Sequence, residues 1–305
     1  MTNNKKQTFR PFFSYFGAKY RNAKLYPEPL HGGVIIEPFA GSAGYSVRHL
    51  QNGHQNVILC EKNPTIANIW KYLIQVSPER ILSLPDINND QTVDDLHECT
   101  DVEKELIGFW LNRATTAPTK SPSKWMRKPK EDIKIVDTND QMHLKKLVHS
   151  NETPIRNDSE NRIYAGSFWG TRVKNTIASQ VDFIRNWKVY ECSYEELLEQ
   201  IDIDELCRTY GITKDKITWY IDPPYQKAGI FYTSGFNSKC IDFEHLGSWC
   251  KSLPGRVIVC ENEGADWLDF TYLADIKTTR KGRRSHEVIW TNFVRDCDKQ
   301  ISLFK

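Results

Sequence analysis

The stretch Val34-Ile35-Ile36-Glu37-Pro38-Phe39-Ala40-Gly41-Ser42-Ala43-Gly44 decides the fold. An apolar strand ends in a loop of small residues, and a helix-like stretch from Tyr45 to Leu50 follows directly. Gly41 and Gly44 let the backbone come close to a ligand, and the amino end of a helix favours polar or anionic groups. The order of strand, small-residue loop and helix predicts an α/β sheet with a binding site at the end of this strand.

A second apolar strand, Val57-Ile58-Leu59-Cys60, ends in Glu61. An acidic residue after the second strand can accept hydrogen bonds from both hydroxyls of a ribose. The dinucleotide fingerprint G-x-G-x-x-G is absent, and Glu37-Pro38-Phe39 would crowd a pyrophosphate, which disfavours a nicotinamide cofactor. The loop and the acid together indicate a different ligand that contains adenosine.

A third apolar run, Thr218-Trp219-Tyr220-Ile221, leads into Asp222-Pro223-Pro224-Tyr225. Two prolines lack backbone N–H groups, so the carbonyls around them cannot join a ladder and remain available as acceptors. The Asp222 carboxylate and a prolyl carbonyl could each accept one N–H of an amino group on an aromatic base, with Tyr225 stacked on its ring. The alternative is an edge strand that ends in a proline turn, with Asp222 as a cap.

Near the N-terminus, Phe13-Ser14-Tyr15-Phe16-Gly17-Ala18-Lys19 places an aromatic face, a glycine and a cation in one short loop. In this order the three segments resemble the alpha-group, Dam-like, adenine-specific DNA methyltransferases. The family patterns correspond to Phe13–Lys19, Glu37–Gly44 and Asp222–Tyr225. Smaller matches are Phe109–Arg113, which resembles an aromatic-L-N-R segment, and Glu287–Asn292, which resembles the closing hairpin strand of the family.

The resemblance implies a Rossmann-like class I methyltransferase sheet with helices on both faces, plus an inserted, mainly helical target-recognition domain. Residues 1–64 and 187–305 would form the catalytic domain. Residues 65–186 would form the insert, with a recognition core at about 112–166, since a connection of that length should carry its own fold. Strands are expected near residues 34–37, 57–60, 187–191, 217–221, 256–260 and 286–292, and helices over Thr65–Gln75, Val102–Leu111 and Val173–Trp187.

The resemblance also implies methyl transfer from S-adenosylmethionine to the N6 amine of an adenine flipped out of duplex DNA. The family's cofactor contacts fall on Tyr15, Gly17, Lys19, Glu37, Pro38, Phe39, Gly41, Glu61, Ser193 and Asp222. Its catalytic residues fall on Asp222, Pro223, Pro224 and Tyr225. No metal or covalent intermediate is needed. Ser193 stands where relatives often have an Asp, which suggests that the adenine of the cofactor is held differently.

Two basic runs are candidate phosphate contacts, although a formal net charge of +2 makes the chain as a whole neither strongly basic nor acidic. The first run contains Arg113, Lys120, Lys124, Arg127, Lys128 and Lys130, and the second Lys277, Arg280, Lys281, Arg283 and Arg284. Neither run contains an acidic residue. Solvated surface is the alternative for each run, and duplex DNA is the expected partner if they contact phosphate.

The aromatic segment Gln226–Lys239 is expected to be a loop that orders on DNA and helps to hold the extruded base, or else a lid over the core. The departures Ser14 and Ala114-Thr115-Thr116-Ala117-Pro118 lie where relatives read sequence, so the target need not be GATC. Alternative functions are methylation of an RNA base or a protein amide, and DNA binding without catalysis. Whether a restriction endonuclease accompanies the protein is left open.

The eight cysteines contain no C-x-x-C pair, and the eight histidines show no metal-ligand spacing, so no metal is expected. Several cysteines lie in apolar strand patterns, which suits reduced, buried thiols. No apolar stretch approaches the length of a membrane span, and no signal peptide precedes the first motif. A cytoplasmic protein is therefore expected.

Overall fold

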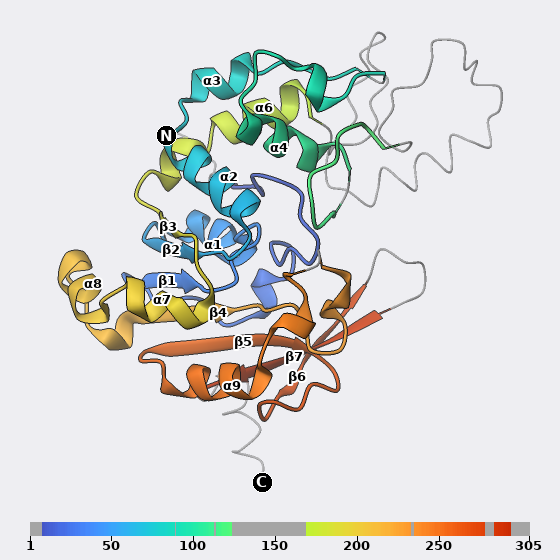
Figure 1. Ribbon diagram of the computed structural model, residues 1–305. Coiled ribbons are helices and arrows are strands. Elements are labelled where there is room, and N and C mark those ends of the chain that lie inside the picture. Colours follow the sequence, from blue (N-terminus) through green and yellow to red (C-terminus); the bar gives the residue numbers. More distant parts are fainter. Residues whose placement is uncertain are drawn as a thin grey trace, which may run out of the picture.

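In the computed structural model, residues 8–88, 90–112, 114–123, 169–232, 235–277 and 284–293 are described. They form one seven-stranded sheet with the order β3-β2-β1-β4-β5-β7-β6 (Figure 1). The strands are β1 (Val34–Glu37), β2 (Val57–Cys60), β3 (Lys188–Tyr190), β4 (Ile217–Ile221), β5 (Arg256–Asn262), β6 (Thr271–Lys277) and β7 (Arg284–Thr291). Strands β1 to β5 are parallel, and β7 is antiparallel to both β5 and β6.

The central strands are buried over their whole length, because helices cover both faces of the sheet. Alternate residues of a strand point to opposite faces, so Ile35 of β1 joins one buried cluster while Val34 and Ile36 join the other. The second cluster is completed by α7 (Tyr194–Gln200), α8 (Ile203–Tyr210) and α9 (Phe243–Ser252). The expected α/β class, a Rossmann-like sheet with helices on both faces, is confirmed by this architecture.

The first cluster lies under α1 (Gly44–His49) and the helices of the segment between β2 and β3. These helices are α2 (Pro64–Gln75), α3 (Pro78–Ser83), α4 (Asp101–Trp110) and α6 (Thr171–Ala178). Trp70 of α2 and Phe109 of α4 belong to the same buried cluster as Ile35, so α2 and α4 pack on the sheet. The helices α3, α4 and α6 stand together at one end of the molecule (Figure 1).

An ion pair between the buried Glu103 and the partly exposed Arg80 joins the helices of this segment. The guanidinium of Arg80 donates to both oxygens of Glu103, each at 2.7 Å, and Tyr72 donates its hydroxyl to the same carboxylate at 2.8 Å. Glu103 also caps its own helix, because it accepts the backbone N–H of Thr100 at 2.8 Å while Thr100 accepts that of Glu103. Although burial opposes it, these donors lower the pKa of Glu103 to about 2.

Two elements differ from those predicted. Strand β6 is not predicted because its sequence pattern is mixed. In the structure a register shift between Tyr272 and Ala274 interrupts its pairing with β7. The single helix expected from Val173 to Trp187 is instead α6 followed by a 3-10 turn over Val181–Ile184. The break lies at Gln180, whose buried amide donates from Nε2 to the carbonyl of Arg10 at 3.0 Å and accepts the N–H of Arg10 at 2.5 Å.

Candidate functional site

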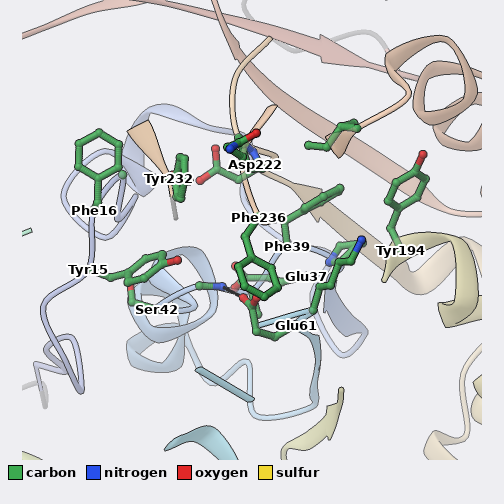
Figure 2. Close-up of a pocket in the computed structure, with 18 of the residues that line it drawn as sticks. Tyr15, Phe16, Glu37, Phe39, Ser42, Glu61, Tyr194, Asp222, Tyr232 and Phe236 are labelled. Atoms are coloured by element: carbon green, nitrogen blue, oxygen red, sulfur yellow. Dashed lines mark hydrogen bonds between the residues drawn. The ribbon is translucent and has the colours of Figure 1, made fainter. Parts of the chain in front are cut away.

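A pocket with about 900 Å³ of empty space, part of it open to solvent, lies at the carboxyl ends of β1, β2 and β4 (Figure 2). Parallel strands place the loops that follow them at one edge of the sheet, and ligands of such folds bind there. The lining includes all the residues that the resemblance assigns to the cofactor, namely Tyr15, Gly17, Lys19, Glu37, Pro38, Phe39, Gly41, Glu61, Ser193 and Asp222. Segments far apart in the sequence therefore meet at one cavity.

Glu61 follows β2 and holds the loop after β1. One of its oxygens accepts the N–H of Gly41 at 2.8 Å, and the other accepts that of Asn63 at 2.9 Å. Burial raises the pKa of Glu61 and these backbone donors oppose the rise. The carbonyl of Gly41 accepts the indole N–H of Trp70 at 2.8 Å, so the peptide groups on both sides of Gly41 are fixed.

Glu37 ends β1 and is 2% exposed. It accepts the backbone N–H of Ser46, in the first turn of α1, at 2.8 Å. Burial raises the pKa of Glu37 to about 8 from an ordinary value of 4.5, and the hydrogen bonds from Ser46 only partly oppose the rise. The raised pKa favours the neutral form of this carboxyl group near neutral pH, and a cationic ligand beside it would favour the ionised form.

The loop between Glu37 and α1 departs from the family at one position. In the pattern E-P-F-x-G-x-G the second glycine falls on Ala43, one residue before Gly44. Ala43 has φ 46 and ψ 44, in the left-handed region that glycine adopts more readily. Its side chain is fully buried, so this loop keeps a glycine-like conformation with an alanine in place.

Asp222 ends the motif strand β4 beside a cation. Its Oδ1 lies 2.9 Å from Nζ of Lys19, and both side chains are largely buried. Burial raises the pKa of Asp222, while the ion pair with Lys19 opposes the rise. Burial alone would lower the pKa of Lys19, but Asp222 and Glu287 outweigh it and raise that pKa. Lys19 thus fixes the Asp222 carboxyl group at the pocket wall.

Tyr225 and Pro223 do not line the pocket, although Pro224 does. Nζ of Lys19 lies 4.6 Å from the centre of the Tyr225 ring, and the Tyr225 hydroxyl donates to Oε2 of Glu287 at 2.5 Å. Glu287 of β7 also accepts the hydroxyls of Tyr26 at 3.1 Å and Ser285 at 3.0 Å. Lys19 thus covers one face of the Tyr225 ring, which was expected to stack on the target base. The hydroxyl of the same ring is held by Glu287.

The pocket also contains residues that were not predicted as cofactor contacts, above all Tyr232 and Phe236 from the loop after the motif. Tyr232 packs edge-on against Phe16, with ring centres 5.3 Å apart, and stands beside Asp222 in the close-up (Figure 2). A Cβ atom on Gly17 would lie 2.4 Å from the Tyr232 hydroxyl, so only glycine leaves room for that ring. The aromatic composition of the loop was the available signal.

Ser193 lines the pocket but already has a structural task. It is the N-cap of α7 and forms a reciprocal capping box with Glu196, whose side chain accepts the N–H of Ser193 at 2.8 Å. The hydroxyl of Ser42, by contrast, is buried at the pocket without a hydrogen-bond partner. A bound polar ligand would satisfy this hydroxyl.

Of the candidate phosphate contacts, Lys120, Lys277 and Arg284 lie within the described residues, and Lys277 pairs with Arg284 across β6 and β7. Nζ of Lys120 lies 2.7 Å from Asp94, and the guanidinium of Arg284 lies 3.3 Å from Asp275. Both pairs are exposed and therefore weak, so a phosphate could replace either carboxylate. Arg113, Lys124, Arg127, Lys128, Lys130, Arg280, Lys281 and Arg283 lie outside the described residues, as does most of the expected recognition core.

Within the described residues, His, Cys, Asp and Glu side chains form no group of three or more that could hold a metal ion. In the same part of the chain, no helix is long and apolar enough to cross a membrane.

Neither a protein-family profile nor a curated protein matches the sequence. Among solved structures, the chain is similar to the rRNA methyltransferase aviRa from Streptomyces viridochromogenes, with a TM-score of 0.36 and 11% sequence identity. The match covers 92% of this chain and 87% of that one. A likeness this distant implies nothing about the activity of this chain.

Proposed function

We propose that this protein is an S-adenosylmethionine-dependent methyltransferase that modifies the N6 amine of adenine in duplex DNA. One observation carries the proposal: Asp222 and Pro224 line a single pocket with Glu61 and the loop that follows β1. The residues proposed to accept the amine and those proposed to hold adenosine therefore share one cavity. The acceptor motif and the resemblance to adenine-specific enzymes support the choice of target.

The pocket residues fit the cofactor in chemistry. Glu61 presents a partly exposed carboxylate for the ribose hydroxyls, and Glu37 presents a buried carboxyl group that favours a cationic partner. The unpartnered hydroxyl of Ser42 adds a further polar contact. When bound, S-adenosylmethionine supplies an activated methyl group.

Asp222 and the prolyl carbonyl after it would then orient the target amine. Lys19 holds Oδ1 of Asp222, which leaves the second oxygen of the carboxylate as the acceptor for one amine N–H. A carbonyl of the motif accepts the other N–H. Both bonds pull the nitrogen lone pair out of conjugation with the ring, which makes the amine a nucleophile. Because the amine loses its proton only after attack, Asp222 acts as a hydrogen-bond acceptor and needs no pKa near neutrality.

Tritiated methyl transfer to unmethylated duplex DNA tests the proposal. The product is digested to nucleosides, and the modified positions are sequenced. Label in N6-methyladenine is expected, and it should be lost in Asp222→Ala while calorimetric binding of S-adenosylhomocysteine and DNA is retained in part. Label found on RNA or on protein would move the pocket to another substrate. DNA binding without any methyl transfer would favour a non-catalytic relative.

A further inference from the structure

The 3-10 turn Gly229–Phe231, four residues after the motif, has two different faces. Ile230 and Phe231 are 51% and 65% exposed, whereas the next residue, Tyr232, turns inward and lines the pocket. Leu25, Leu82, Phe183, Leu198 and Tyr272 are the other large apolar side chains that are exposed among the described residues. None of those five lines the pocket. None is next in the sequence to a residue that lines it, whereas Phe231 is next to Tyr232.

The turn is tied to the motif itself. The N–H of Gly229 donates to the carbonyl of Tyr225 at 2.6 Å. A Cβ atom on Gly229 would lie 2.5 Å from the carbonyl carbon of Pro224, so the backbone of the turn packs directly on the motif. The backbone of the turn is therefore anchored to the motif at Gly229, directly before Ile230 and Phe231.

The charge around this apolar pair suits a nucleic acid. The segment from Gln226 to Ile241 contains Lys227 and Lys239 and no acidic residue, and both lysines are exposed. Cations that flank an exposed apolar pair in the sequence match a polymer whose backbone is anionic and whose interior is a stack of apolar rings. A protein partner would not require this charge.

A base can reach Asp222 only after it leaves its stack, which creates a gap in the duplex. Apolar side chains that enter a base step stabilise such an opened duplex. We propose that Ile230 and Phe231 insert into the base stack beside the flipped adenine and hold the gap open. This inference rests on the proposed function, and it assigns to the turn a role in opening the duplex that is distinct from the contacts of the pocket with the base.

The test compares Phe231→Ala with Leu198→Ala, which truncates an exposed apolar side chain of α7 away from the pocket. Each variant is assayed on two duplexes that carry the target sequence identified by the methyl-transfer experiment. One duplex is fully paired, and the other has a mismatch opposite the target adenine. Phe231→Ala is expected to lose about tenfold in kcat/KM on the paired duplex and to recover to within about twofold of the wild type on the mismatched one. Leu198→Ala should match the wild type on both.

A second readout does not depend on catalysis. With 2-aminopurine at the target position and S-adenosylhomocysteine bound, the wild type should increase fluorescence, and Phe231→Ala should not. Equal activity of Phe231→Ala and wild type on the paired duplex, or equal loss on both duplexes, would overturn the wedge while leaving the proposed function intact. A wild type that methylates no DNA would overturn the proposed function first, and the wedge with it.

Discussion

Compared with the wild type, the variant Glu37→Gln should become increasingly stable as the pH rises. The substitution keeps the shape of the side chain and an oxygen that can accept the N–H of Ser46, but it removes a carboxyl group that is 2% exposed. In the folded protein the pKa of Glu37 is raised to about 8, compared with 4.5 as the ordinary value. Ionising this group therefore costs more in the folded chain than in the unfolded one.

The size of the effect follows from the two pKa values. Because the folded state holds the proton more tightly, the contribution of Glu37 is fully present below pH 4.5 and is lost as the pH rises towards 8. Each pKa unit corresponds to about 1.4 kcal/mol, so the wild type should lose about 3 kcal/mol from this group between about pH 5.5 and pH 8. The glutamine variant should not lose this part.

Urea denaturation gives the free energy of unfolding of both proteins at the two pH values. The effect is the change between the two pH values in the wild type minus the same change in Glu37→Gln. Glu199→Gln, which removes a carboxylate at an exposed position, serves as the control and should follow the wild type. The same Glu37→Gln variant should bind S-adenosylmethionine more weakly if Glu37 faces the cationic part of the cofactor. Parallel curves for the wild type and Glu37→Gln would refute the reasoning, because they would show that Glu37 is ionised in the empty pocket without cost.

Three further predictions concern other residues. Gly17→Ala and Gly32→Ala both place a side chain at positive φ (74 and 69), at a cost of about 1–2 kcal/mol each. Only the new side chain at position 17 meets a neighbour, Tyr232, so only Gly17→Ala should weaken the binding of S-adenosylhomocysteine measured by calorimetry. Equal affinities of the two variants would contradict this. Glu103→Gln should lower the free energy of unfolding by about 2 kcal/mol at neutral pH, because it weakens the charged hydrogen bonds between the buried Glu103 and the partly exposed Arg80. A loss below about 0.5 kcal/mol in urea denaturation would be inconsistent with this. Among the described cysteines only Cys240 is exposed, and it lines the pocket, so iodoacetamide should label it first and S-adenosylhomocysteine should slow the labelling; an unchanged rate would place the ligand elsewhere.

The sheet could be predicted because its central strands carry their own signal. Residues 34–37, 57–60 and 217–221 are continuous apolar runs, as strands covered on both faces must be. Strand β6 lacks that signal, since it lies at the edge of the sheet and exposes Tyr272. The break after α6 depends on the contact of Gln180 with Arg10, which joins distant parts of the chain and leaves no periodic trace in the sequence.

The site shows the same division. Motif residues lie directly after strands, and the parallel sheet brings those ends together, so Glu37, Glu61 and Asp222 could be placed in one pocket from their positions alone. Tyr232 and Glu287 could not. The first enters the pocket because a loop folds back over Gly17, and the second reaches Tyr225 because a hairpin pairs with β5. Both depend on how later segments return, which spacing does not encode.

The clamp on Gly41 has a thermodynamic consequence. Glu61 holds its N–H and Trp70 holds its carbonyl, so the loop after β1 is ordered by its contacts with α2 and with the residue that follows β2. Fixing a backbone residue costs about 1–2 kcal/mol of conformational entropy, and here folding has already met that cost. The binding energy of a ligand at this edge of the sheet therefore goes into affinity, with little spent on organising the loop that receives it.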